Sequence, residues 1–169
     1  MEDESLELAA TVGRALICIQ MVELLLGSLL RTAFRAAETV PTVQELEREQ
    51  ETVRRATLGC LIKRLRQKVE LDPELETYLN KFVEDRNRFV HHLVEEASKS
   101  ASDEDHSRDF SKQMLEDSIR LMELFFAKFL SWYQALQPNE PMDEETKRYV
   151  EQAGNWKKPL HQLFRVRGS

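Results

Sequence analysis

Apolar residues recur at intervals of three and four along most of this chain, and this spacing constrains the fold more than any other feature. Such a period places the apolar side chains on one face of an α-helix, whereas a half-buried strand requires strict alternation. Alternating β-branched residues are almost absent, and the 169 residues include only five glycines and five prolines. The sequence therefore predicts an all-α protein with no β-strand.

The composition, with 41% hydrophobic and 32% charged residues, is ordinary for a soluble globular protein of one domain. The formal net charge of -6 argues against binding nucleic acid over the whole surface, because sequence-independent affinity comes from Lys and Arg that neutralise phosphates. A local basic site stays compatible with this charge.

The two cysteines, Cys18 and Cys60, lie in apolar helical segments and lack the spacing of a metal site. They are predicted to be buried thiols in a reducing compartment, and no metal or other cofactor is expected. The first residues, MEDESLELAA, are acidic, whereas a signal peptide begins with basic residues. These features predict a cytoplasmic protein.

The most hydrophobic run extends from Ala15 to Leu30 and includes Gln20 and Glu23. It holds about 16 residues, fewer than the roughly 20 apolar residues that a membrane span needs. The prediction is a soluble core helix and no membrane association. Because this helix is apolar on nearly all sides, we expect it to pack inside a bundle or across a subunit interface.

Four principal helices are expected. The first runs from about Ser5 to Phe34, and the second begins at a capping box from Thr42 to Glu45. The second restarts at Thr57 after a charged segment, with an apolar face of Leu58, Leu61, Ile62 and Leu65.

The third helix begins near Pro73, which follows the N-cap residue Asp72, and it ends near Ala97. The polar segment 98–107 precedes the fourth helix, from about Arg108 to Leu136. Its large apolar residues are expected in the core: Phe110, Met114, Leu115, Ile119, Met122, Phe125, Phe126, Phe129, Trp132 and Tyr133.

Residues 1–136 are thus predicted to form one helical bundle. Residues 137–169 are expected to add a short helix, from Asp143 to Ala153, and a basic tail on the same domain. The tail is either solvated, docked on its own bundle, or an RNA-binding segment. Its cationic residues are Lys157, Lys158, Arg165 and Arg167.

One stretch of the third helix, VEDRNRFVHHL, interrupts the apolar pattern. On a helical wheel, Arg86 falls near the centre of the apolar stripe, while Asn87 and His91 are neighbours at its edge. A buried guanidinium stays charged, so it needs an acidic partner or a semi-open polar site at an interface. One interpretation is therefore structural: Arg86 pairs with a carboxylate such as Glu23 or Asp85.

The other interpretation is chemical. A neutral imidazole accepts a proton from a hydroxyl, its protonated form donates one to a leaving oxygen, and a fixed guanidinium stabilises charge on a phosphate. Metal-free cleavage of RNA through its 2′-OH needs these groups. Arg86 and His91 lie about 140° apart on a straight helix, so two subunits related by a two-fold axis would have to combine them.

At these residues the sequence resembles the HEPN superfamily of small all-helical proteins, whose signature is Arg-x4-6-His. The resemblance implies an antiparallel four-helix bundle, a homodimer whose motifs line one cleft, and metal-independent endoribonuclease activity, often in toxin-antitoxin or anti-phage systems. It assigns the scissile phosphate to Arg86, acid-base catalysis to His91 and an orienting role to Asn87. His92 and Arg88 are auxiliary candidates. Where some members have Tyr, this chain has Leu93.

The leading functional expectation is therefore a homodimeric ribonuclease that cleaves RNA, with an antitoxin or another regulatory protein as a further partner. The alternative is a non-catalytic HEPN-like helical module that binds a nucleotide, RNA or a protein. The acidic balance of the chain favours the alternative, whereas the basic tail favours the nuclease.

Overall fold

The computed structural model of this chain describes residues 2–34, 44, 48, 56–96, 104–152, 156 and 158–166. Most of these residues are helical, as predicted. The elements are α1 (Glu2–Arg31), α3 (Leu58–Lys68), β1 (Val69–Leu71), α4 (Pro73–Glu96), α5 (Glu104–Leu136), α6 (Glu144–Gln152), α7 (Leu160–Leu163) and β2 (Phe164–Val166). The predicted capping box at Thr42 and Glu45 lies outside the described residues.

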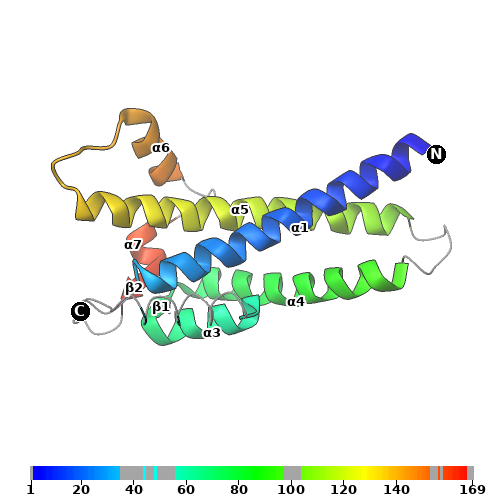
Figure 1. Cartoon of the computed structure of the whole chain (residues 1–169), viewed down its shortest axis with the longest axis horizontal. Helices are drawn as coiled ribbons and strands as arrows, with labels where there is room; N and C mark the ends of the chain where they lie inside the picture. Colours follow the sequence, from blue (N-terminus) through cyan, green and yellow to red (C-terminus); the bar gives the residue numbers. More distant parts are fainter. Residues whose placement is uncertain are drawn as a thin grey trace.

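The long helices pack side by side (Figure 1). The most extensive contact joins α1 to α5, while α4 packs against both α5 and α3, and α3 also contacts α1. Figure 1 shows that α4 runs in the opposite direction to α1 and α5. α6 stands apart from this group and contacts α5.

The core lies where the apolar faces of these helices meet. The predicted face of α3 is confirmed, because Leu58, Leu61, Ile62 and Leu65 are all buried. In α5 the prediction was too wide: the helix is apolar on more than one side, but only the side that meets α1 and α4 is buried, and the contact with α6 leaves Phe126 exposed. Ile119, Phe126 and Tyr133 are exposed, whereas the buried large residues of α5 are Met114, Leu121, Leu124 and Phe125.

The expectation of no β-strand was wrong. β1 and β2 form a two-stranded antiparallel sheet in which Glu70 lies opposite Arg165 and Leu71 opposite Phe164. Each strand alternates apolar and polar residues over only three positions, which is shorter than the run of about four to eight residues that predicts a strand from sequence.

The C-terminal segment is docked on the bundle, which was one of the alternatives for the tail. Leu163 and Phe164 are buried, and the Phe164 ring lies 5.5 Å from the Phe34 ring and 6.4 Å from the Phe125 ring, between centroids. The backbone N–H of Asp72 donates to the carbonyl oxygen of Leu163 at 3.1 Å. Residues 158–166 therefore belong to the folded domain.

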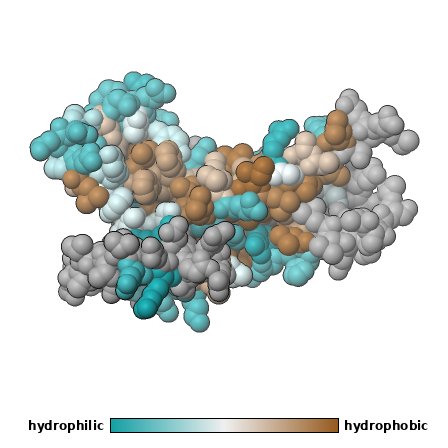
Figure 2. Space-filling model, in the orientation of Figure 1, coloured by the Kyte–Doolittle hydropathy of each residue, from teal (hydrophilic) through white to brown (hydrophobic). Residues whose placement is uncertain are grey.

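One face of α1 is not covered by the described residues. Leu6, Ile17 and Leu24 are 70%, 62% and 57% exposed, and Met21 is also exposed; we call these four residues the α1 strip. Figure 2 shows apolar surface across α1 and α5 on the viewed face. By length and composition Leu6–Arg31 would suffice to cross a membrane, yet its opposite face lies in the core through Ala15, Ile19, Val22, Leu26 and Leu29.

Candidate functional site

The helix that carries the candidate residues begins as predicted. Asp72 accepts a hydrogen bond from the backbone N–H of Glu74 at 3.0 Å, and Pro73 is the first helical residue. The buried stripe of α4 consists of Leu75, Leu79, Phe82 and Phe89. Arg86 lies between Phe82 and Phe89 on this stripe, at the position predicted for it.

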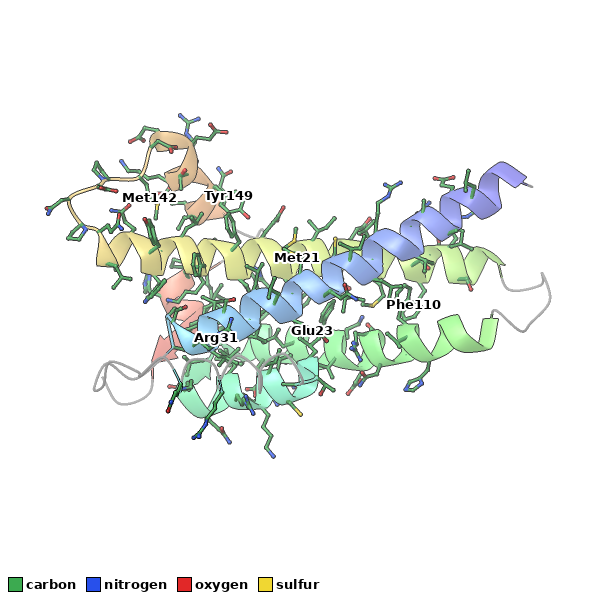
Figure 3. All side chains as sticks on the ribbon, in the orientation of Figure 1. Met21, Glu23, Arg31, Phe110, Met142 and Tyr149 are labelled. Atoms are coloured by element: carbon green, nitrogen blue, oxygen red, sulfur yellow. The ribbon has the colours of Figure 1, made fainter. Side chains whose placement is uncertain are left out.

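Arg86 is paired within its own chain. Its Nη2 lies 3.1 Å from Oε1 of Glu23 on α1, and its Nη1 donates to Oδ1 of Asn87 at 3.2 Å. Both Arg86 and Glu23 have side chains that are 23% exposed. Figure 3 shows Glu23 between α1 and α4. The pairing with Glu23, one of the two carboxylates considered from the sequence, is therefore confirmed.

The pair leaves part of the guanidinium unused. Glu23 and Asn87 each accept one hydrogen bond, whereas a guanidinium carries five N–H donors. The Nε of Arg86 is buried and has no hydrogen-bond partner. The side chain is thus fixed in place while retaining donors that a further acceptor can use.

Asp85 is buried, and the sequence pattern did not indicate this. Its carboxylate lies 2.8 Å from Nη2 of Arg88 and also accepts a hydrogen bond from Lys81, which raises the pKa of Lys81. The guanidinium of Arg88 lies 4.7 Å from the centroid of the Phe110 ring. Arg88, an auxiliary candidate, is therefore engaged in a different cluster from Arg86.

Asn87 and His91 lie on an exposed edge of α4. Lower on the same helical face, α3 covers α4: Arg66 forms an ion pair with Glu76, with 2.9 Å between Nε and Oε1, and donates a hydrogen bond to Asn80. The spacing from Asn80 to Asn87 and His91 keeps these residues on that face, about two and three turns further along α4. We call the pair Asn87 and His91 the α4 edge.

His91 does not meet Arg86 in one chain. The five-residue interval turns the two side chains about 140° apart, and His91 makes no hydrogen bond with any described residue. The backbone of His92 belongs to α4, but its side chain lies outside the described residues. Within one subunit, the guanidinium and the imidazole therefore converge poorly.

The predicted RNA-binding residues of the tail are only partly described. Lys158 is bonded to Asp72, and this hydrogen bond lowers the pKa of the Asp72 carboxyl. Arg165 is exposed on β2, while Lys157 and Arg167 lie outside the described residues. Lys158 therefore fastens the tail to the start of α4.

A second polar cluster, which the sequence analysis did not identify, holds the tail against the bundle. Tyr78 donates to Oδ1 of Asp117 at 2.6 Å, and the Trp156 ring meets the Tyr78 ring edge-on at 5.2 Å between centroids. The guanidinium of Arg120 lies 4.5 Å from the Trp156 ring centroid. Burial and the neighbouring Asp117 carboxylate raise the pKa of Tyr78.

The described residues contain no group of three or more His, Cys, Asp or Glu side chains that could hold a metal ion. Cys60 is exposed, so the prediction that it is buried was wrong; it lies on the outer side of α3, opposite Leu58, Leu61, Ile62 and Leu65. Cys18 is half-buried, and burial raises the pKa of its thiol.

Comparison of this chain with known protein families, with characterised proteins and with solved structures finds no match. The interpretation of the site therefore depends on its own geometry.

Proposed function

We propose that this chain is a HEPN-like, metal-independent endoribonuclease whose active cleft forms between two subunits of a homodimer. The observation that carries the proposal is the placement of three groups on α4: Arg86 is fixed by Glu23 and Asn87, and the α4 edge beside it is exposed. In this proposal α1, α3, α4 and α5 are the helices of the four-helix bundle that the resemblance implies.

The homodimer follows from the angle between the two reacting groups. A two-fold axis beside α4 brings the Arg86 guanidinium of one subunit toward the His91 imidazole of the other, because an isologous interface uses the same patch twice. The α1 strip supplies apolar surface for such an interface. Glu23 lies on a flank of α1, about 100° round the helix from Leu24, the nearest residue of this strip.

The proposed reaction is cleavage through the 2′-OH. His91 accepts the proton of the 2′-OH, the 2′-oxygen bonds to phosphorus, and the bond from phosphorus to the 5′-oxygen breaks. The leaving 5′-oxygen takes a proton from an imidazolium, which gives a 2′,3′-cyclic phosphate and a 5′-OH end. Arg86 stabilises the added negative charge on the phosphate with its unused N–H groups.

The test compares matched histidine variants. RNA is incubated in excess chelator with the wild type, His91→Ala, Arg86→Ala and His161→Ala; His161 is an exposed histidine on α7. We expect His91→Ala and Arg86→Ala to lower the cleavage rate by at least about 100-fold, and His161→Ala to cleave like the wild type, with cyclic phosphate ends. Equal cleavage by all four proteins, or none by the wild type, contradicts the proposal.

A second candidate function is a non-catalytic helical module. The Arg86–Glu23 pair favours it, because a carboxylate already neutralises the guanidinium, and the α1 strip then serves a protein partner such as an antitoxin or another regulatory protein. This candidate predicts that His91→Ala keeps full partner binding and that no variant cleaves RNA. Cytoplasmic localisation and a role in toxin-antitoxin or anti-phage defence belong to the same proposals.

A further inference from the structure

α3 carries an unusual concentration of positive charge for a protein with a net charge of -6. Four of its eleven residues are Lys or Arg, and none is acidic. The buried residues Leu58, Leu61, Ile62 and Leu65 define its inner face. Lys63 is exposed on the side away from this face, and Arg64 and Lys68 are half-buried on one flank. We call these three residues the α3 basic face.

The fourth cation of α3 behaves differently. Arg66 turns toward α4, where it bonds to Glu76 and Asn80. Lys63, Arg64 and Lys68, by contrast, make no hydrogen bond or ion pair with any described residue. Within the described part of the chain, α3 therefore contains one paired cation and three that make no ion pair.

Helix stability explains only part of this arrangement. Lys68 lies in the last turn, where a cation interacts favourably with the helix dipole. Lys63 and Arg64 lie in the middle of the helix and have no such role. Arg64 and Lys68 are also four residues apart, and like charges at this spacing destabilise a helix. The remaining charge is thus unexplained by the folding of the chain itself.

We propose that the α3 basic face binds the phosphate backbone of RNA without reading its sequence. A protein interface normally depends on buried apolar or aromatic anchors and is depleted of Lys, and this face presents Lys63, Arg64, Gln67 and Lys68 instead. Phosphate contacts by Lys and Arg are what sequence-independent nucleic-acid binding requires. No aromatic residue is present in α3, so base stacking is not part of the recognition.

One residue of the α3 basic face lies toward α4. A Cβ added at Gly59 would lie 3.7 Å from Cγ1 of Val83, so the start of α3 touches α4 one turn before Asn87. Lys63 follows Gly59 by one turn of α3 on the same side. A phosphate bound by Lys63 therefore lies on the side of α3 that meets α4, whereas Arg64 and Lys68 lie on the other flank of α3. The choice of RNA rests on the proposed function, whereas the cationic surface does not.

The experiment measures binding of a short fluorescent single-stranded RNA by anisotropy over about 50 to 200 mM salt. The triple variant K63Q/R64Q/K68Q, which removes three positive charges, is compared with R66Q, which removes one positive charge at the paired position. Gln is a good helix former, and circular dichroism verifies that both variants fold. Each neutralised single-strand phosphate adds about 0.7 to the slope of log affinity against log salt, so we expect the triple variant to lose about 2 in slope.

We also expect the triple variant to bind at least about tenfold more weakly at the lowest salt, while R66Q binds like the wild type. The affinity for single-stranded DNA of the same sequence should depend on salt and on the α3 cations in the same way, since the contacts are to phosphate. Wild-type affinity in the triple variant, an equal loss in R66Q, or preferential binding of polyglutamate overturns the inference. The same RNA is tested with His91→Ala: if no protein cleaves but binding still depends on α3, the nuclease proposal fails and this inference stands.

Discussion

Among single residues, Arg86 shows how a cation is accommodated in an apolar helical stripe. Its guanidinium cannot lose its proton, so burial is tolerated only where acceptors compensate for lost water. Glu23 and Asn87 supply two of these acceptors. The sequence indicated the need for a carboxylate but left Glu23 and Asp85 as alternatives, because the choice depends on how α1 lies on α4.

Substitution of the Arg86–Glu23 pair should reveal its energetic coupling. Arg86→Met, Glu23→Gln and the double variant form a cycle measured by urea denaturation. At 23% exposure the pair is intermediate between surface and buried pairs, so we expect a coupling of about 1 to 2 kcal/mol. Glu23→Gln alone should destabilise the fold, because it leaves a half-buried charge without its anion. Strictly additive effects would show that the two side chains do not interact.

Lys128 is a second poorly solvated cation, and it was not singled out from the sequence. Its amine lies 5.7 Å from the Phe34 ring centroid and 6.0 Å from that of Phe164, and burial lowers its pKa. At a pH below this lowered pKa, Lys128 is charged in both states, and burial of the charge destabilises the folded state. As the pH rises from the lowered pKa of the folded state toward the pKa of the unfolded state, about 10.4, this destabilisation disappears, so the free energy of unfolding increases with pH.

We therefore expect Lys128→Met to stabilise the protein near neutral pH by about 0.5 to 1 kcal/mol, after allowance for solvent screening and for lost cation–π attraction. The midpoints of thermal unfolding of the variant and the wild type should converge as the pH approaches about 10.4. Lys147→Met, at an exposed position on α6, is the control and should show no such pH-dependent gain. A gain that stays constant with pH would exclude burial of charge as its cause.

At the level of helices and strands, the sequence predicted correctly those features that depend on a few neighbouring residues. The apolar face of α3 and the start of α4 at Pro73 are visible in a few consecutive residues, and both are confirmed. The exposure of Phe126 and Tyr133 was not predictable in this way, because α5 is apolar on several sides. Which of these sides is buried depends on how the other helices pack against α5. β2 was missed because its pairing partner, β1, lies far away in the sequence.

The α1 strip makes a prediction about association. Ile17→Glu places a charge in the strip without entering the core, since Ile17 is 62% exposed. We expect the wild type to sediment as a dimer at micromolar concentration and Ile17→Glu as a monomer of unchanged unfolding midpoint. Gln152→Glu adds the same charge at an exposed site on α6 and should remain dimeric. A monomeric wild type, or a dimeric Ile17→Glu variant, contradicts this interface.

For the whole molecule, the docked C-terminal segment closes the core. Phe164 is 3% exposed and packs against Phe34 and Phe125, so Phe164→Ala should reduce the free energy of unfolding by about 3 to 5 kcal/mol. Its neighbour Arg165 points to solvent from the same strand, and Arg165→Ala should change stability by less than about 0.5 kcal/mol. Both free energies of unfolding are measured by denaturant titration. A similar decrease in the two variants would mean that the pairing of β2, and not the burial of the Phe164 ring, provides the stability.

The pairing of β1 with β2 also has a consequence for synthesis. Val69 is synthesised long before its partner Val166, so the sheet can close only after the helices between them have been made. Until then the aromatic cluster of Phe34 and Phe125 lacks the Phe164 ring, and its apolar surface stays exposed. Completion of the core therefore waits for translation of β2.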